Sequence, residues 1–209
     1  SLRLLQVMSR LWGGEFLGIL FLLSSCGHRQ VLPSVVLADT VSWRSGDLIF
    51  RTGNSIESHF VLRADKSGFS HVGMLVRTQR GWQVVHATTG EDEDNIDTVK
   101  SEPVAHFIQS CRCVKFKVAR VSCSNALAKE AAHFIMKQIG KPFDDDFSLT
   151  DTTKYYCTEL VWQAYRQQGI DLSNGHRHQI SLLGFRKTCL LPEDIISSPI
   201  CKDLNAPVK

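Results

Sequence analysis

The chain has 209 residues, of which 43% are apolar and 22% are charged. This length and apolar content are enough for one globular domain with a buried core, and they exclude a disordered chain. The 24 Lys and Arg residues stand against 21 Asp and Glu residues, which gives a net charge of only +3. Because no dense basic stripe occurs in the sequence either, we expect no nucleic-acid partner.

Residues 1–25 have the pattern of a secretion signal. Arg10 precedes the uncharged run FLGILFLL at residues 16–23. As a helix this run would rise about 12 Å, well short of the roughly 30 Å hydrocarbon core of a bilayer. A basic start followed by a short apolar run is typical of a signal peptide and disfavours a spanning helix.

The signal ends in LSSCG at residues 23–27, which resembles a bacterial lipoprotein signal. The resemblance implies cleavage before Cys26 and lipidation of that cysteine. Residues 26–43 would then be a lipid-anchored tether and residues 44–209 the domain. Gly27 indicates the outer membrane of a Gram-negative bacterium, with the domain facing the periplasm. The alternative is an ordinary signal peptide in which Cys26 has no role.

The first half of the domain predicts mainly strands. A turn residue feeds a short apolar strand at residues 46–50, and a short helix is expected in the polar stretch that runs to Leu62. Two apolar runs, at residues 71–76 and 82–87, predict a β-hairpin. The acidic stretch 91–97 is expected to be a solvated loop.

The pattern then changes to helices. Residues 114–121 alternate between apolar and basic side chains and predict one more half-buried strand. A helix is expected from a cap at Ser124 or Asn125 to Ile139, with Ile139 as the last residue of its buried apolar stripe and Gly140 as its stop.

A second helix is expected at residues 156–168, ending at Gly169. Between the two helices lies a loop at residues 140–144 that Pro142 forces open. The whole pattern indicates an α+β fold, in which one antiparallel sheet packs against a few helices.

Cys157 lies in the first turn of the second expected helix. There the unpaired N–H groups and the helix dipole stabilise a thiolate and can lower the pKa of a cysteine. The simpler interpretation is a core cysteine, since positions 157, 160, 161 and 164 share one helix face.

His71 and His86 stand near the open ends of the predicted hairpin. If residues 78–81 form a four-residue loop, residues whose numbers sum to 159 face each other. His71 is then opposite Thr88, and His86 is its diagonal neighbour on the same side, about 7–8 Å away at the backbone. One ring could take a thiol proton while the other orients it. Each histidine alone is simply a hydrogen-bonded residue at a strand end.

Five segments together resemble the permuted papain-fold cysteine hydrolases, in particular the YiiX-like branch of the NlpC-type superfamily. They are GDLIF at 46–50, SHVGMLV at 70–76, VHATTG at 85–90, GKPFD at 140–144 and YCTELVW at 156–162. The resemblance covers about residues 44–170. It implies a circularly permuted papain-like (NlpC-type) fold, in which the histidines precede the cysteine along the chain.

By this resemblance Cys157 is the nucleophile, His71 the base and His86 the third polar residue of a Cys-His-His site without metal or cofactor. Many members of the YiiX-like branch have Glu where this chain has His86, a departure that changes the charge beside the Cys-His pair. The oxyanion would bind the Cys157 backbone N–H and a tyrosine hydroxyl, from Tyr155 or Tyr156, of which we assign Tyr156.

These residues predict a thiol-dependent hydrolase, a cysteine peptidase or amidase of the bacterial envelope. It would cleave an amide bond in a peptide, a cell-wall peptide or an N-acyl small molecule, through an acyl-enzyme that water hydrolyses. Three alternatives stay open: an acyltransferase of the same fold, a non-catalytic lipoprotein that binds a ligand in the cleft, and a zinc site built from the same three side chains.

Other polar residues have structural interpretations. Asp47 is expected to cap the turn before the first strand. Cys111-x-Cys113 is only half of a zinc pattern. Residues 144–146 lack the glycine-turned loop of a calcium site and are expected to form a solvated loop. His176-x-His178 is expected at the surface. The six cysteines beyond Cys26 do not define a disulfide framework.

Overall fold

The structure, a computed structural model, describes residues 42–90, 96–182 and 185–204. The expected signal peptide, Cys26 and nearly all of the expected tether lie outside the described residues, as does most of the acidic stretch 91–97. Within the described ranges, no helix is long and apolar enough to cross a membrane.

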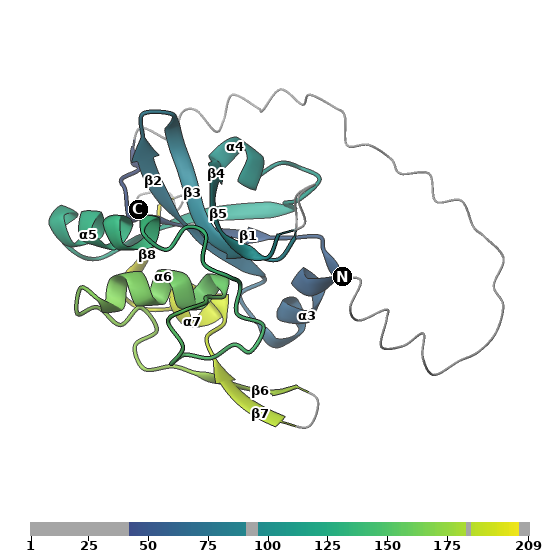
Figure 1. The fold of residues 1–209 in the computed structure, drawn as a ribbon. Helices are drawn as coiled ribbons and strands as arrows, with labels where there is room; N and C mark the ends of the chain where they lie inside the picture. Colours follow the sequence, from purple (N-terminus) through teal and green to yellow (C-terminus); the bar gives the residue numbers. More distant parts are fainter. Residues whose placement is uncertain (1–41, 91–95, 183–184, 205–209) are drawn as a thin grey trace, which may run out of the picture. The chain divides into compact units, whose positions relative to one another are not determined.

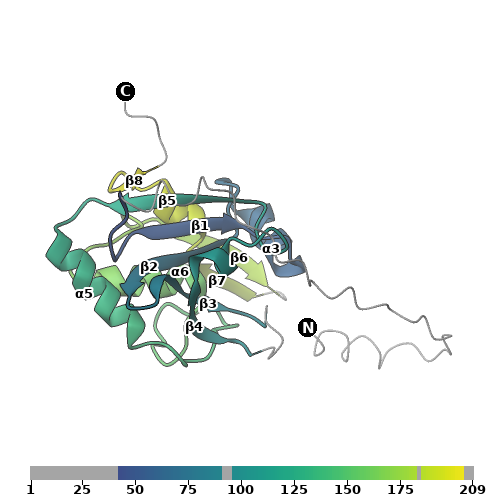
Figure 2. The same ribbon diagram turned by 90° about the horizontal axis from the view of Figure 1, so that it is seen from above.

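A six-stranded antiparallel sheet organises the domain, with the strand order β4-β3-β2-β1-β5-β8. Figure 2 shows β5, β1, β2, β3 and β4 side by side in this order. Two further strands, β6 and β7, form a separate hairpin (Figure 1). The strands are β1 (Leu48–Thr52), β2 (His71–Thr78), β3 (Gly81–Thr88), β4 (Thr98–Pro103), β5 (Lys115–Val121), β6 (His178–Leu182), β7 (Phe185–Cys189) and β8 (Cys201–Asp203).

Five helices accompany the strands in the described part of the chain. They are α3 (Ile56–Ala64), α4 (Val104–Phe107), α5 (Asn125–Met136), α6 (Cys157–Arg166) and α7 (Pro192–Ile196). Helices α5 and α6 cover one face of the sheet, whereas α4 lies on the other (Figure 1). The expected α+β class, an antiparallel sheet packed against a few helices, is confirmed.

Strand alternation divides the core between the two faces of the sheet. In β2, Val72 and Met74 belong to the cluster that contains Leu160 of α6. Their neighbour Leu75 belongs to the cluster that contains Phe107 of α4. Successive side chains of a strand point to opposite faces, so β2 contributes to both clusters and is buried over most of its length.

The hairpin has the predicted register. The partners run from Met74 opposite Val85 to Thr78 opposite Gly81, so their residue numbers sum to 159. The turn is shorter than expected, because the strands continue to Thr78 and Gly81 and leave two residues between them. The same register results, since two residues are removed symmetrically from the ends of the expected loop.

The helix after β5 starts where the sequence predicts but ends earlier. The Ser124 side chain accepts a hydrogen bond from the Leu127 backbone N–H, as expected of the cap. The helix stops at Met136 because the following N–H groups bond three residues back, tightening the last turn. The prediction that Ile139 joins the buried stripe was wrong, since this residue is 41% exposed.

Asp47 has the predicted capping role and also joins two strands. Its carboxylate accepts the Arg44 backbone N–H at 2.9 Å. It is fully buried and pairs with Arg120 of β5 through Nε at 2.9 Å and Nη2 at 2.7 Å. These hydrogen bonds replace the water that the buried carboxylate loses.

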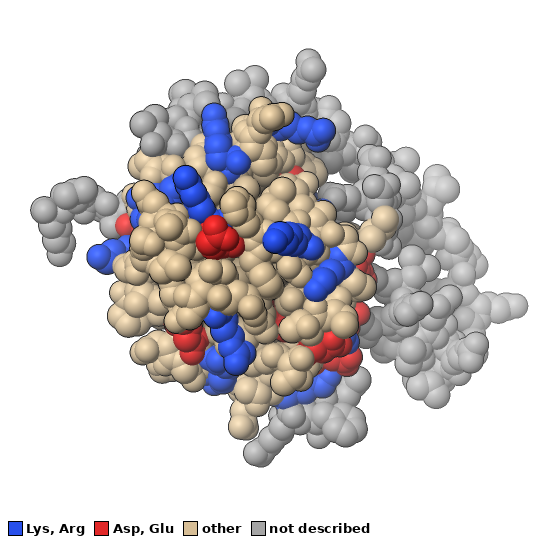
Figure 3. All heavy atoms as spheres, turned by 60° about the vertical axis from the view of Figure 1, so that its left-hand side comes forward, with Lys and Arg blue, Asp and Glu red and all other residues tan. Residues whose placement is uncertain are grey.

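The surface charges are mixed. On the face in Figure 3, Lys and Arg side chains are scattered among Asp and Glu side chains and form no continuous basic patch. This distribution agrees with the small net charge of the chain.

Candidate active site

The first residue of β2 and a residue near the end of β3 form a histidine pair. His71 Nε2 lies 2.8 Å from His86 Nδ1, with the two rings nearly perpendicular at 83°. His71 is 8% exposed and His86 is fully buried. The predicted meeting of these two rings on one side of the hairpin is confirmed.

A carboxylate that the sequence analysis missed continues this chain of contacts. Glu102 of β4 places Oε1 3.1 Å from His86 Nε2. Its other oxygen, Oε2, faces His106 Nδ1 at 2.8 Å and Arg112 Nη1 at 3.1 Å. Burial alone would raise the pKa of Glu102, but His86, Arg112 and Lys100 together hold it far below its ordinary value. Glu102 is therefore ionised at neutral pH.

Phe107 and Arg51 enclose the histidine pair. The Phe107 ring of α4 lies 5.7 Å from the His71 ring and 5.1 Å from the His86 ring. Arg51 of β1 stacks over Phe107 with its Cζ atom 4.4 Å from the ring centroid, and its Nη1 donates to the Phe107 carbonyl at 2.8 Å. Burial, and then the neighbouring Arg51 and His86 side chains, lower the pKa of His71 well below its ordinary value. His71 is thus a neutral imidazole at pH 7.

Cys157 is the first residue of α6, after the cap residue Tyr156. Its sulfur lies 3.6 Å from Thr158 Oγ1 and faces the backbone N–H of Val72, the residue that follows His71 in β2. Burial raises the pKa of the Cys157 thiol, although the surrounding backbone N–H groups partly offset this. The expected lowering by the helix terminus is therefore outweighed by desolvation. The result is a neutral thiol beside the start of β2.

The Tyr156 hydroxyl has a structural contact. It accepts a hydrogen bond from the Leu190 backbone N–H at 2.9 Å, and the residue is only 2% exposed. Its ring packs against Phe147 with centroids 5.2 Å apart. The assignment of this hydroxyl to an oxyanion hole is not supported, because the group is occupied in holding the segment after β7.

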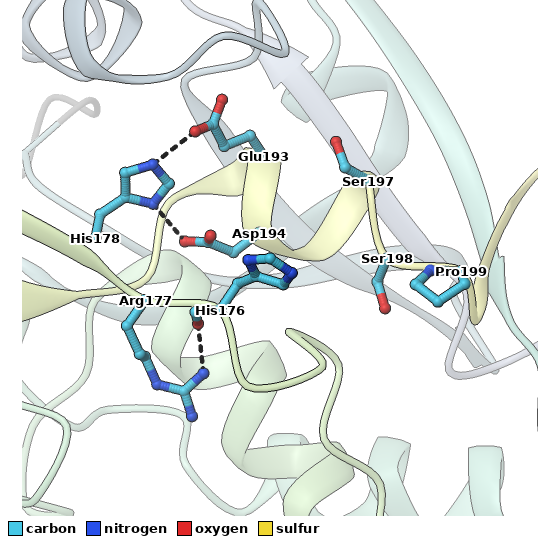
Figure 4. Close-up of a pocket in the computed structure, with 8 residues that line it drawn as sticks. All are labelled: His176, Arg177, His178, Glu193, Asp194, Ser197, Ser198 and Pro199. Atoms are coloured by element: carbon cyan, nitrogen blue, oxygen red, sulfur yellow. Dashed lines mark hydrogen bonds and ion pairs between the residues drawn. The ribbon is translucent and has the colours of Figure 1, made fainter.

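His176 and His178 differ in their surroundings. His176 is exposed, as expected. His178 lines a cavity of about 310 Å³, with Nε2 2.6 Å from Glu193 Oε1 and Nδ1 2.9 Å from Asp194 Oδ2 (Figure 4). Burial alone would lower the pKa of His178, but the two carboxylates raise it above its ordinary value. This pair of contacts ties β6 to α7.

The remaining metal-binding candidates are dispersed. Cys111 is exposed whereas Cys113 is buried, and all six cysteines that the structure describes are free. Asp144 is not solvated as expected, because it is fully buried and accepts the backbone N–H groups of Asp146 and Ser148. In the described ranges, no three His, Cys, Asp or Glu side chains are arranged to hold a metal ion.

Glu159 is a second buried carboxyl near the cysteine. It lies in the first turn of α6 and is fully buried. Burial, together with the negative charge of Asp144, raises the pKa of Glu159 to about 9. It is protonated at neutral pH in the folded protein, although it would be ionised in the unfolded chain.

Glu159 should therefore make stability fall as the pH rises. Its folded pKa is raised, so its contribution is fully present below about pH 4.5 and is lost between there and about pH 9. Glu159→Gln has nearly the shape of the protonated carboxyl group but cannot ionise. It should be more stable than the wild type at pH 8 by on the order of a few kcal/mol. The difference should shrink toward pH 5 in urea unfolding experiments. An equal difference at both pH values would contradict the assignment.

The fold and these residues define a permuted papain-like amidase. Residues 42–183 match the model of the family described as "Permuted papain-like amidase enzyme, YaeF/YiiX, C92 family", and the chain belongs to this family. Its fold is accordingly the circularly permuted papain-like fold that the sequence motifs imply.

Two relatives are similar over most of their length. The uncharacterized protein YiiX of Escherichia coli (strain K12) is 27% identical over 154 residues, which are 72% of this chain and 71% of that protein. The crystal structure of "metalloprotein yiiX" from Escherichia coli O157:H7 has a TM-score of 0.65 at 23% identity. It matches 79% of this chain and 98% of its own, and shows the same fold.

Proposed function

We propose that the protein is a thiol-dependent amidase with Cys157 as nucleophile, His71 as base and His86 as the third residue. The observation that supports this most directly is the 2.8 Å contact between the two buried histidines. It lies at the start of β2, where the Val72 N–H faces the cysteine sulfur. A thiol at the start of a helix and an imidazole oriented by a second polar side chain are the two groups that nucleophilic catalysis by cysteine requires.

The reaction starts from a neutral pair. His71 Nε2 contacts His86, so Nδ1 is left as the atom that takes the thiol proton. The Cys157 sulfur attacks the amide carbonyl as it loses this proton, because burial disfavours a free thiolate. The His71 imidazolium then protonates the leaving nitrogen, and the C–N bond breaks to give a thioester. Water, activated by His71, hydrolyses the thioester and restores the thiol.

Backbone groups are the proposed oxyanion donors. The N–H groups in the first turn of an α-helix have no partners within the helix, and they carry partial positive charge. In α6 these groups surround Cys157, which is the first helical residue. An oxyanion formed on the carbon bonded to sulfur would be stabilised by these groups.

The proposed substrate is a peptide, a cell-wall peptide or an N-acyl small molecule in the bacterial envelope. The lipoprotein-like signal supports this location, with Cys26 as the lipid-bearing residue and a membrane contact through that lipid. Product analysis in the presence of an added amine or alcohol would reveal the acyltransferase alternative, which uses the same thioester.

The relative of known crystal structure is described as a metalloprotein. A zinc site made of Cys157, His71 and His86 would need one nitrogen of each ring aimed at a common point. Here His71 Nε2 and His86 Nδ1 are engaged with each other, and His86 Nε2 faces Glu102. This geometry favours proton relay over metal binding by the same residues.

Alkylation with iodoacetamide tests the proposed function. Loss of amide hydrolysis should follow the labelling of Cys157, as measured by mass spectrometry of the peptide that contains it. Cys111 is exposed and serves as an internal control, since its labelling should not change the activity. Full labelling of Cys157 with hydrolysis intact would refute the proposal.

A further inference from the structure

Glu102 occupies a position that the proposed triad does not use. It lies on β4, the neighbour of the strand that carries His86, and is 5% exposed. One carboxylate oxygen is 3.1 Å from His86 Nε2. The other is 2.8 Å from His106 Nδ1 and 3.1 Å from Arg112 Nη1. Each oxygen of this carboxylate thus lies close to at least one nitrogen that can carry a proton.

This arrangement determines which nitrogen of each histidine carries a proton. An ionised carboxylate can only accept hydrogen bonds, so the proton between Glu102 and His86 is on His86 Nε2. We take His86 as neutral in the resting site, so that its Nδ1 is an acceptor and receives a hydrogen bond from His71 Nε2. The neutral His71 ring therefore has an unprotonated Nδ1. Only this tautomer can take a proton from Cys157.

The same carboxylate also balances the charge that appears during the reaction. When His71 accepts the thiol proton, a positive charge forms in a buried place beside Arg51, whose guanidinium opposes it. Interactions between charges are strong in such surroundings. Glu102 is the carboxylate that the described structure places against the histidine pair, and its negative charge favours the imidazolium. The charged or titratable groups that face these residues are Arg51 on β1, His86 on β3, Lys100 on β4, His106 on α4 and Arg112 in the loop before β5.

We propose that Glu102 is a positioning residue that fixes the tautomers of His86 and His71 and stabilises the imidazolium. The relay would then have four members, in the order Cys157, His71, His86 and Glu102. This inference rests on the proposed function of Cys157 and His71. It assigns to the fourth member a role that acts through His86 and involves no contact with substrate.

The tautomers can be tested on the unmodified protein. Long-range ¹H–¹⁵N NMR spectra of the histidine rings at pH 7.5 should show both His71 and His86 protonated at Nε2 and unprotonated at Nδ1. A protonated Nδ1 on either ring would overturn the inference. This measurement needs neither a substrate nor a variant that folds.

Kinetics of Glu102→Gln provide the second test. The amide oxygen of the new side chain should face Arg112, which turns the NH₂ group toward His86 and reverses its tautomer. We expect kcat to fall by about 10²- to 10³-fold with little change in KM. The NMR spectrum of the variant should show the reversed tautomer, a change that mere destabilisation would not produce.

Glu193→Gln is the matched control. It also removes a glutamate from a histidine, because Glu193 contacts His178 at 2.6 Å, but this pair lies at the cavity beside α7. Its kcat should equal that of the wild type. If Cys157→Ala is inactive while Glu102→Gln keeps the wild-type kcat and tautomers, the role of Glu102 is refuted and the proposed function stands. If Cys157→Ala is active, the proposed function itself fails.

Discussion

Replacing Cys157 with alanine should abolish amide hydrolysis. The thioester cannot form without the sulfur, and removing the nucleophile of a catalytic triad costs about 10⁶-fold in kcat. The assay is hydrolysis of the peptide or N-acyl amide that the wild type cleaves best in a panel of both kinds. Cys157→Ala should keep the wild-type unfolding temperature to within a few degrees, because the substitution removes only the sulfur atom.

The control for this variant is Cys201→Ala. Cys201 is a second partly buried cysteine, and burial raises its pKa to about 12. It lies on β8, which β5 and β1 separate from β2 in the sheet. We expect wild-type activity for Cys201→Ala. An equal loss of activity in both variants would mean that removing a cysteine lowers hydrolysis by disturbing the fold.

Replacing His71 with alanine should lower kcat/KM by about 10²- to 10⁴-fold, the usual contribution of a general base. The pH profile should change as well. In the wild type, activity should rise as His71 loses its proton, and it should be level by pH 7, since the pKa of His71 is below 6.5. In His71→Ala the thiol must ionise unaided, and burial raises the pKa of the Cys157 thiol above its ordinary value. The residual rate should therefore keep rising through pH 9.

His133→Ala is the control for this profile, because His133 is on α5 with a side chain that is 70% exposed. Its profile should match that of the wild type. A residual rate in His71→Ala that is level from pH 7 to pH 9 would show that His71 is not the base.

The histidine pair could be predicted because its geometry is local. Strands have a period of two residues, and a short turn fixes which residues face each other. The hairpin therefore carries enough information to bring His71 and His86 onto one side of the sheet. The helix positions of Cys157 and the Ser124 cap follow in the same way from neighbouring residues.

Glu102 could not be predicted, because its position depends on a strand that the sequence conceals. In β4 only Val99 and Glu102 are buried, so the strand has little of the apolar alternation that identifies such elements. A carboxylate fills the inward position where an apolar side chain is expected. The segment at residues 91–97 also separates β3 from β4 along the chain, so the sequence alone does not show how the two strands pair.

The raised pKa of the Cys157 thiol could not be predicted for a similar reason. The sequence shows that the cysteine starts a helix, which favours a thiolate. It does not show how strongly β2 and the surrounding core exclude water from the sulfur. Desolvation depends on residues distant in sequence and outweighs the helix effect here.

The position of Glu102 on the outermost strand links catalysis to local unfolding. In the described residues no further strand pairs with β4, and Val99 bonds to the backbone of Gly140 and Lys141 through two hydrogen bonds of 2.8 Å. The edge strands of a sheet open at a lower free energy than its central strands. Each time β4 separates from β3, the Glu102 carboxylate would move away from His86 while the other five strands stay paired. Amide hydrogen exchange at residues 98–102 would then report the fraction of molecules with an intact relay.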